Sequence, residues 1–377
     1  MKSPAVSVIM PTYNHAAFVE QSIRSVLQQR DIDFELLIAD DGSVDHTREV
    51  IASIRDDRIQ FFPNTVNRGA CVVTNELIKR ASGEFIALIN SDDYWIEADK
   101  LAFQIQIMKA NQDIGACFGR ACFVDKDGMT IDKSNLSYGH LFDEGNRSRG
   151  RWLRHFFDVG NCICHPTMLI RKSCYEELGM YDNRLRQLPD FDMWIRLLKR
   201  YDIHVSNREM IAFRQLPGES ASTATPVNIR RILNETYFIL ERFFDGIPRD
   251  VFLDGFGDQV ARPDLPDEIH LTIEHALLYL AKKGWGAHIY KLIGLEKIHF
   301  LLGSDKHRSV LINHYGIDDR TFHSMAADVN TLDLGDLTGR LCAINGMALI
   351  AEVKRRFALR TLAMLRTFSG RFLKKFL

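Results

Sequence analysis

The chain has 377 residues, enough for two domains or for one large domain with an appendage. Its 46% hydrophobic and 26% charged residues are typical of a folded globular protein and exclude a fibrous or largely disordered chain. The formal net charge of −1 provides no global basic field, so nucleic acid is not an expected partner.

The cysteines and the apolar runs indicate the cellular compartment of the protein. The seven cysteines follow no framework spacing, which indicates reduced thiols in a reducing compartment. The first apolar run is interrupted by Pro11 and is too short for the apolar region of a signal peptide. No uninterrupted apolar run reaches the ~20 residues that a membrane-spanning helix needs. We therefore expect a cytoplasmic protein that does not span a membrane.

From residue 6 the chain alternates short, β-branched apolar runs with amphipathic stretches, the pattern of βαβ units. This alternation predicts a doubly wound, mainly parallel α/β sheet. The predicted strands are 6–10, 34–41, 58–63, 85–90 and 114–124, and the predicted helices are 18–27, 46–54, 70–80 and 101–108.

The pattern changes twice further along the chain. Residues 125–160 are rich in Gly, Asp, Asn, Ser and Arg and weakly periodic, so we expect an irregular excursion there, of the kind that forms a mobile flap. Beyond Pro226 helical patterns dominate. We expect a catalytic domain at 1–225 and an α-helical region at 226–377 that serves acceptor, partner or membrane association.

Polar residues follow three of the predicted strands, at 11–14, 40–43 and 91–93. In open α/β sheets ligands bind outside the carboxyl ends of the strands, so these groups are expected to line one crevice. A lone Asp-Asp pair at a strand end is more often a turn or a helix cap. Two such pairs, each ending a strand of one sheet, favour a binding site.

The residue types at these strand ends suit a nucleotide and a metal ion. The Tyr13 ring can stack on a base, and Asp41 can accept a hydrogen bond from a base N–H. Asp93 can bind a hard divalent cation that bridges phosphates. Asp40 is expected to orient its loop, and Asp92 to position a ribose or to support Asp93.

Four blocks resemble, in order, the motifs of the family 2 glycosyltransferases of the GT-A fold. They are VSVIMPTYNHAAFVEQSIRSVLQQ, FELLIADDGSVDHT, NRGACVVTNELIKRASGEFIALINSDDYWIEADKLAFQ and HPTMLIRKSCYEELGMYD…LPDFDMWIRL, within residues 4–225. The resemblance implies transfer of a sugar, with inversion, from a nucleoside diphosphate sugar to an acceptor hydroxyl, assisted by Mg²⁺ or Mn²⁺. It favours a UDP-sugar donor and a glycan or lipid-linked acceptor in bacterial surface glycan synthesis.

The resemblance also implies roles for single residues. Asp93 matches the metal ligand of an Asp-x-Asp-like motif. Arg214 stands in an Arg-x-His element whose His is Leu216 here, and it is a candidate to bind diphosphate oxygens. With the strand-end residues, the predicted nucleotide and donor contacts are Pro11, Thr12, Tyr13, Asn14, Asp41, Asn67, Gly69, Asn75, Asp92 and Arg214.

Asp190 lies where the family keeps its catalytic base. A carboxylate there removes the acceptor proton as the acceptor oxygen attacks the anomeric carbon. Asp190 is also placed to cap the following helix. The family's acidic residue before the base is Pro189 here, so Asp192 is a second candidate.

A histidine and two nearby cysteines raise separate alternatives. His165 matches an acceptor-side His of the family, although a lone His after an apolar run is more often structural. Cys162 and Cys164 could join it on zinc, but no second ligand pair follows at zinc spacing, so buried thiols are expected.

The sequence also bears on three alternative functions. The Gln-x-x-Arg-Trp signature of processive synthases is absent, so one sugar per encounter is expected. A sugar-nucleotide nucleotidyltransferase would open with a Gly-rich phosphate loop, whereas this chain opens with PTYNHAAF. A degenerate, non-catalytic scaffold is the third alternative, favoured by the departures at Pro189 and Leu216.

The last residues, 353–377, carry eight Lys or Arg interleaved with Leu, Phe and Met and no acidic residue. An amphipathic basic helix can lie on an anionic membrane surface, which would place the protein at the inner face of the membrane. A terminal helix that packs its apolar stripe on the domain fits the pattern equally well.

Overall fold

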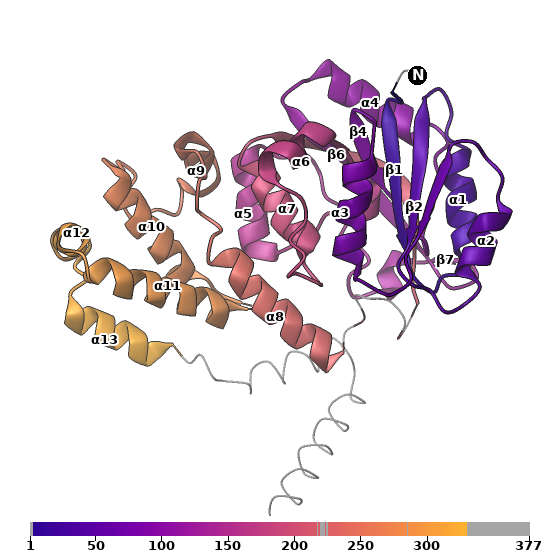
Figure 1. The fold of residues 1–377 in the computed structure, drawn as a ribbon. Helices are drawn as coiled ribbons and strands as arrows, with labels where there is room; N and C mark the ends of the chain where they lie inside the picture. Colours follow the sequence, from indigo (N-terminus) through magenta and orange to yellow (C-terminus); the bar gives the residue numbers. More distant parts are fainter. Residues whose placement is uncertain (1–2, 217, 219–222, 224, 285, 330–377) are drawn as a thin grey trace, which may run out of the picture. The chain divides into compact units, whose positions relative to one another are not determined.

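The computed structural model describes residues 3–216, 218, 223, 225–284 and 286–329 (Figure 1). The described residues up to His323 form one compact unit. The basic segment at 353–377 lies outside the described residues.

This compact unit contains a nine-stranded mixed sheet with the order β3-β2-β1-β4-β8-β6-β9-β5, and β7 pairs with β6. Strands β3, β2, β1 and β4 are parallel to one another, whereas β8 is antiparallel to both β4 and β6. The strands are β1 (Val6–Thr12), β2 (Phe34–Asp40), β3 (Ile59–Pro63), β4 (Phe85–Leu88), β5 (Tyr94–Trp95), β6 (Ile114–Val124), β7 (Thr130–Ile131), β8 (Leu169–Arg171) and β9 (Asp202–Arg214).

Helices cover both faces of the parallel part, which explains why its strands are apolar on both sides. Side chains alternate between faces along β1, so Ile9 belongs to one core with α3 (Ala70–Arg80) while Val8 belongs to another with α1 (Val19–Leu27) and α4 (Lys100–Ala110). Figure 1 shows α3 on one face, and α1 with α2 (Thr47–Ser53) on the other.

The carboxyl end of β1 extends beyond its neighbour β4. The β1–β4 register ends with Ile9 opposite Leu88, so Pro11 and Thr12 have no β4 partner. A proline, which has no N–H, is tolerated at such a position because no ladder hydrogen bond is lost on that side. The free end of β1 therefore leaves room for the turn that follows β4.

The segment predicted to be irregular, residues 125–160, contains the helix α5 (Arg149–Val159) and the short strand β7. The prediction was wrong for α5 because three arginines interrupt the apolar pattern of this helix in the sequence. Trp152, Leu153, Phe156 and Phe157 recur at the spacing of one helical stripe and are buried.

Within the residues that the structure describes, the region after Pro226 consists of helices joined by turns and loops and contains no strand, as predicted. Phe157 of α5 packs against aromatic rings of this region, including Phe243 and Tyr290, whose ring centroids lie 5.3 Å and 4.9 Å away. The helical region thus shares a core with α5. Its helices are α8 (Pro226–Leu240), α9 (Arg249–Phe256), α10 (Glu268–Ala281), α11 (Ala287–Leu302), α12 (Asp305–Tyr315) and α13 (Asp319–Asp328).

None of the helices within the described residues combines the length and the apolar character needed to cross a bilayer.

Candidate active site

The loops after β1 and β2 hold each other in place. The backbone N–H of Asp41 donates to Thr12 O at 2.8 Å, and that of Asn14 donates to Ser43 Oγ at 2.8 Å. Asn14 has a φ of 53°, a left-handed conformation that Asn tolerates better than most residues. These bonds leave Tyr13 42% exposed at the tip, so its ring can contact a ligand.

The two carboxylates after β2 have different partners. Asp40 is buried and pairs with Arg48 at 2.6 Å, so it orients its loop as expected. Asp41 accepts backbone N–H groups from Arg68 at 2.7 Å and from Gly69 at 2.8 Å. Gly69 has a φ of 95°, which favours glycine, and it begins α3. Asp41 therefore fixes the turn at the start of α3.

Asn67 precedes this turn and its side chain is exposed. A Cβ on Gly42 would lie 2.6 Å from the backbone N of Asn67, so the β2 loop and the 66–69 turn come close only because residue 42 is glycine. Asn67 and Gly69 thus lie beside the Asp41 loop, where the sequence predicted donor contacts.

Asp93 lies in the turn after β4, and its side chain is buried. Its Oδ1 accepts the backbone N–H of Arg214 at 2.8 Å, and its Oδ2 accepts from Asn90 Nδ2 at 3.0 Å. Burial, followed by the charge of Asp92, raises the pKa of Asp93 well above its ordinary value. A nearby cation would stabilise the ionised form of a carboxylate in this setting.

Arg214, the last residue of β9, is buried and ties several segments together. Its Nε donates to Asp92 O at 2.8 Å, and Nη1 donates to Asp125 O at 3.0 Å and to the neighbouring carbonyl. Its Nη2 donates to Gln21 Oε1 at 2.6 Å. All three guanidinium nitrogens therefore bind protein groups, and Arg214 organises the Asp92–Asp93 turn.

Asp190 lies in the first turn of α7 (Pro189–Leu198), and Asn161 Nδ2 donates to its Oδ2 at 2.7 Å. Asp192 instead forms an ion pair with Arg196 at 2.8 Å. That guanidinium also donates to backbone carbonyls, among them Leu178 O at 2.8 Å. The two candidate bases thus differ, because Asp192 is held by a cation and Asp190 by a neutral amide.

His165 and Asn75 both contact Tyr181. Nε2 of His165 shares a hydrogen bond of 2.8 Å with the Tyr181 hydroxyl, and burial lowers the pKa of His165, so its ring is neutral near pH 7. Asn75 Nδ2 donates to Tyr181 O at 2.8 Å, and Asn75 Oδ1 accepts from Tyr181 N at 3.1 Å. These contacts tie α3 and the His165 turn to the segment that leads to α7.

The charges of the metal-ligand candidate and the base candidate influence the same buried thiol. Burial and then the charges of Asp93 and Asp190 raise the pKa of Cys164 well above its ordinary value. Both carboxylates therefore act on one buried thiol, although they are far apart in the sequence. Two residues of the site were not predicted. Asn161 binds Asp190 and Gln21 binds Arg214, and no spacing pattern in the sequence indicates either contact.

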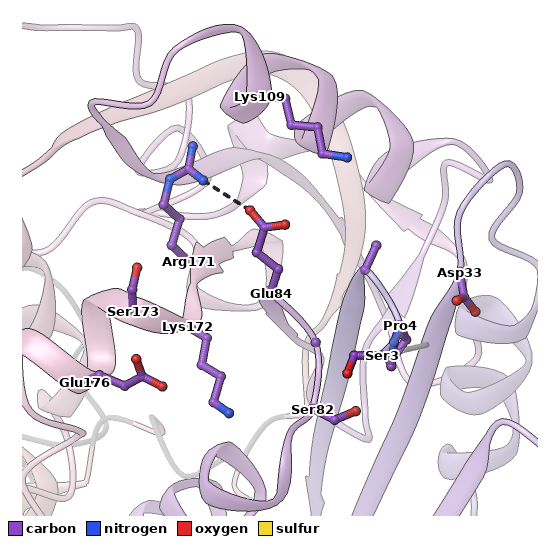
Figure 2. Close-up of a pocket in the computed structure, with 12 residues that line it drawn as sticks. Ser3, Pro4, Asp33, Ser82, Glu84, Lys109, Arg171, Lys172, Ser173 and Glu176 are labelled. Atoms are coloured by element: carbon purple, nitrogen blue, oxygen red, sulfur yellow. Dashed lines mark ion pairs between the residues drawn. The ribbon is translucent and has the colours of Figure 1, made fainter. Parts of the chain in front are cut away.

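A cavity of ≈ 610 Å³ lies elsewhere, at the amino ends of β1 and β4 (Figure 2). It is lined by Ser3 and Pro4, by Glu84 and by Arg171, and Arg171 and Glu84 pair across 3.6 Å. Because ligands of open α/β sheets bind at the carboxyl ends of the strands, this cavity is not the expected donor site.

One group of three side chains in the described ranges could hold a metal ion by its spacing, namely Glu144, His155 and Cys162. Glu144 already pairs with Arg147 at 2.6 Å, and burial raises the pKa of Cys162 to about 12. The nearby cation and the protonated thiol both disfavour a metal ion there.

Comparison with known proteins decides the family. The model of glycosyl transferase family 2 matches residues 7–178. The chain is 45% identical over 263 residues to the UDP-Glc:alpha-D-GlcNAc-diphosphoundecaprenol beta-1,3-glucosyltransferase WfgD of Escherichia coli, covering 66% of this chain and 95% of that protein. The chain belongs to glycosyl transferase family 2.

A second relative by sequence and a solved structure are also similar to this family 2 glycosyltransferase. It is 29% identical to the putative teichuronic acid biosynthesis glycosyltransferase TuaG of Bacillus subtilis, over 63% of this chain and 87% of that protein. Its fold matches S. aureus TarS 1-349, solved with UDP-GlcNAc, with a TM-score of 0.51 at 17% identity over 85% of this chain and 91% of that chain. The predictions of a GT-A fold and of a glycosyltransferase are confirmed.

Proposed function

We propose that this glycosyltransferase moves a sugar, with inversion, from a uridine diphosphate sugar to a hydroxyl group of a lipid-linked glycan. The observation that carries the proposal is the buried Asp93 carboxylate in the turn after β4, held by a backbone N–H and an amide side chain, in a chain of glycosyl transferase family 2. A diphosphate-binding group and a base on either side of one sugar are what a single displacement requires.

The donor base would bind at the loops after β1 and β2. Tyr13 is exposed and offers its ring for stacking. Each oxygen of Asp41 accepts one backbone N–H, which leaves a lone pair on each for a base N–H. Pro11, Thr12 and Asn14 shape the same loop. Uracil is favoured because the Escherichia coli relative is named for UDP-Glc.

Asp93 is the residue that fits a divalent cation, with Asp92 beside it. Its carboxylate is buried next to a second carboxylate and is held by only two neutral donors, so a cation would offset the cost of its charge. When bound there, Mg²⁺ or Mn²⁺ would balance the negative charge of the departing diphosphate. Arg214 keeps this turn in place.

Asp190 would act as the base. It removes the proton of the acceptor hydroxyl, whose oxygen forms a bond to the anomeric carbon while the bond from that carbon to the diphosphate oxygen breaks. The nucleoside diphosphate leaves with the bonding electrons, and one displacement inverts the anomeric configuration. Asn161 orients the carboxylate from its Oδ2 side.

The acceptor class follows from the relatives. The Escherichia coli relative is named for a GlcNAc on diphosphoundecaprenol, and the Bacillus subtilis relative for teichuronic acid biosynthesis. We propose an acceptor of the same chemistry, a sugar on a diphospholipid used for surface glycan synthesis, which places the enzyme at the cytoplasmic face of a membrane. The basic residues at 353–377 would contribute peripheral contact.

The test is a transfer assay. UDP-glucose, UDP-galactose, UDP-GlcNAc and GDP-mannose are each incubated with a synthetic GlcNAc-diphospholipid, with Mn²⁺ or with EDTA. We expect transfer from a UDP-sugar that EDTA abolishes, and an inverted anomeric configuration by NMR. Retention of configuration, or transfer that EDTA does not affect, would contradict the proposal. Release of pyrophosphate from UTP and a sugar phosphate would instead indicate a nucleotidyltransferase.

A further inference from the structure

Glu235, on α8 of the helical region, accepts three consecutive backbone N–H groups. Its Oε1 accepts from Arg186 at 2.9 Å, and its Oε2 accepts from Gln187 at 2.8 Å and from Leu188 at 2.9 Å. Only 4% of Glu235 is exposed. These amides immediately precede α7, the helix whose second residue is Asp190.

The local chemistry explains why this position is a carboxylate. Backbone N–H groups at the start of a helix have no partner within the helix, and they favour negative charge. Three adjacent amides from residues 186–188 need acceptors on one side, which the two oxygens of Glu235 supply. Charge-assisted hydrogen bonds of this kind are stronger than neutral ones, so they fix the backbone at the entry to α7.

The same segment is held at its other end by α3. Asn75 binds both the N–H and the carbonyl of Tyr181, and Asn75 Nδ2 also donates to Asn183 Oδ1 at 2.9 Å. The segment 181–188 is therefore held at its first residue by Asn75 of the sheet domain and at its last three residues by Glu235 of the helical region.

We propose that Glu235 is a positioning residue for the transfer reaction. Through the backbone of residues 186–188 it sets the position of Asp190, so the helical region fixes the geometry of the base. This inference rests on the proposed function, in which Asp190 is that base. Glu235 itself touches neither donor nor acceptor.

The chain offers a matched control for a purely structural role. Glu274 of α10 is 1% exposed and accepts backbone N–H groups from Ala261 at 2.7 Å and from Arg262 at 2.9 Å. It is a buried carboxylate that holds a loop, as Glu235 is, but its loop carries no proposed site residue. Glu274→Gln and Glu235→Gln should both lower thermal stability.

The experiment compares the full-length wild-type enzyme with E235Q, E274Q and D190N. The donor KM and kcat are measured with a UDP-sugar and a synthetic GlcNAc-diphospholipid. Because misplacing a reacting group by ~1 Å can cost ~100-fold, E235Q should lower kcat by between about tenfold and a hundredfold. Its donor KM should stay within about twofold, because the donor loops follow β1, β2 and β4. E274Q should keep the wild-type kcat below its melting transition.

Each result has a distinct meaning. If D190N abolishes transfer while E235Q and E274Q share the same kcat, the inference is overturned and the proposed base stands. If D190N keeps the wild-type kcat, the proposed base is wrong and this inference falls with it. Should E235Q not give a cooperative melt, E235D carries the comparison. It keeps both carboxylate oxygens but retracts them by one methylene, so kcat should again fall with donor KM unchanged.

Discussion

The backbone N–H of Arg214 donates a 2.8 Å hydrogen bond to Oδ1 of Asp93, so the end of β9 holds the carboxylate that follows β4. The Arg214 side chain reaches from this point to Asp92 O and Gln21. One residue thus joins α1, the β4 turn and β9.

Asp93→Asn should stabilise the protein in the absence of metal while abolishing metal-dependent transfer. Burial and Asp92 raise the pKa of Asp93, so its ionised form is less favoured in the folded protein than in the unfolded chain. Stability is therefore lost as pH rises above the ordinary carboxyl value of ~3.9. The amide removes this cost, and we expect a gain of about 1 kcal/mol at pH 7.5 in EDTA by urea unfolding.

The pH dependence provides the control for this prediction. Near pH 3.5 the wild-type carboxyl is protonated, so the stability difference between wild type and D93N should disappear. If D93N is less stable than wild type at both pH values, the Asp93 carboxylate stabilises the folded protein and the prediction is wrong.

Arg214→Lys should greatly reduce transfer although it keeps the positive charge. A lysine has no planar fork and cannot donate together to Asp92 O, Asp125 O and Gln21, so buried acceptors lose their partners. We expect a loss of about 2–3 kcal/mol in unfolding free energy and weaker metal-dependent UDP binding. Arg24→Lys, on the exposed ion pair with Glu20, is the comparison and should change little. Equal UDP binding by R214K and wild type would refute the organising role.

The two candidate bases can be separated by Asp190→Asn and Asp192→Asn. D190N should lower kcat by about 10²–10⁴-fold, because it loses the proton acceptor. D192N loses its ion pair with Arg196 and should be less stable, yet its kcat should stay near the wild-type value at temperatures where it is folded. The reverse ranking of the two kcat values would assign the base to Asp192.

His275 of α10 should make the protein sensitive to acid. Burial lowers the pKa of His275 to about 3, and its ring stacks on Phe244 with centroids 4.6 Å apart. The folded protein therefore binds fewer protons than the unfolded chain, whose His has a pKa of ~6.5, and stability falls as pH drops below that value. Between pH 7 and pH 5 this group should cost about 2 kcal/mol.

Urea unfolding of wild type and His275→Phe at the two pH values measures this contribution. Phenylalanine keeps the aromatic packing and does not titrate, so H275F should lose about 2 kcal/mol less than wild type on acidification. The same loss in both proteins would mean that His275 titrates normally in the folded state.

Sequence reasoning located the parts of the site that follow strands. Asp41 comes directly after β2 and Asp93 lies in the turn after β4, and the position of a parallel strand in the sheet then places its carboxyl end. The elements of the parallel half were predicted for the same reason, since apolar runs and amphipathic helices alternate there. The two-residue strand β5 was missed because so short an element has no periodicity.

Contacts between distant segments could not be predicted. Arg214 and Gln21 are 193 residues apart, and Asn161 reaches Asp190 across 29 residues with no repeating spacing. Glu235 sits in a helix with an ordinary amphipathic pattern, and a glutamate in such a helix is normally solvated. Only the packing of α8 on the segment before α7 makes it a buried acceptor.

The most direct test of the donor site is calorimetric titration of UDP into wild type, D93N and D190N, with Mn²⁺ and with EDTA. We expect Mn²⁺ to strengthen UDP binding to wild type and to D190N, because Asp190 is proposed to act on the acceptor and not on the donor. D93N should bind UDP equally with Mn²⁺ and with EDTA. A Mn²⁺-dependent gain in D93N as large as that in wild type would contradict the assignment of Asp93, and with it the central claim.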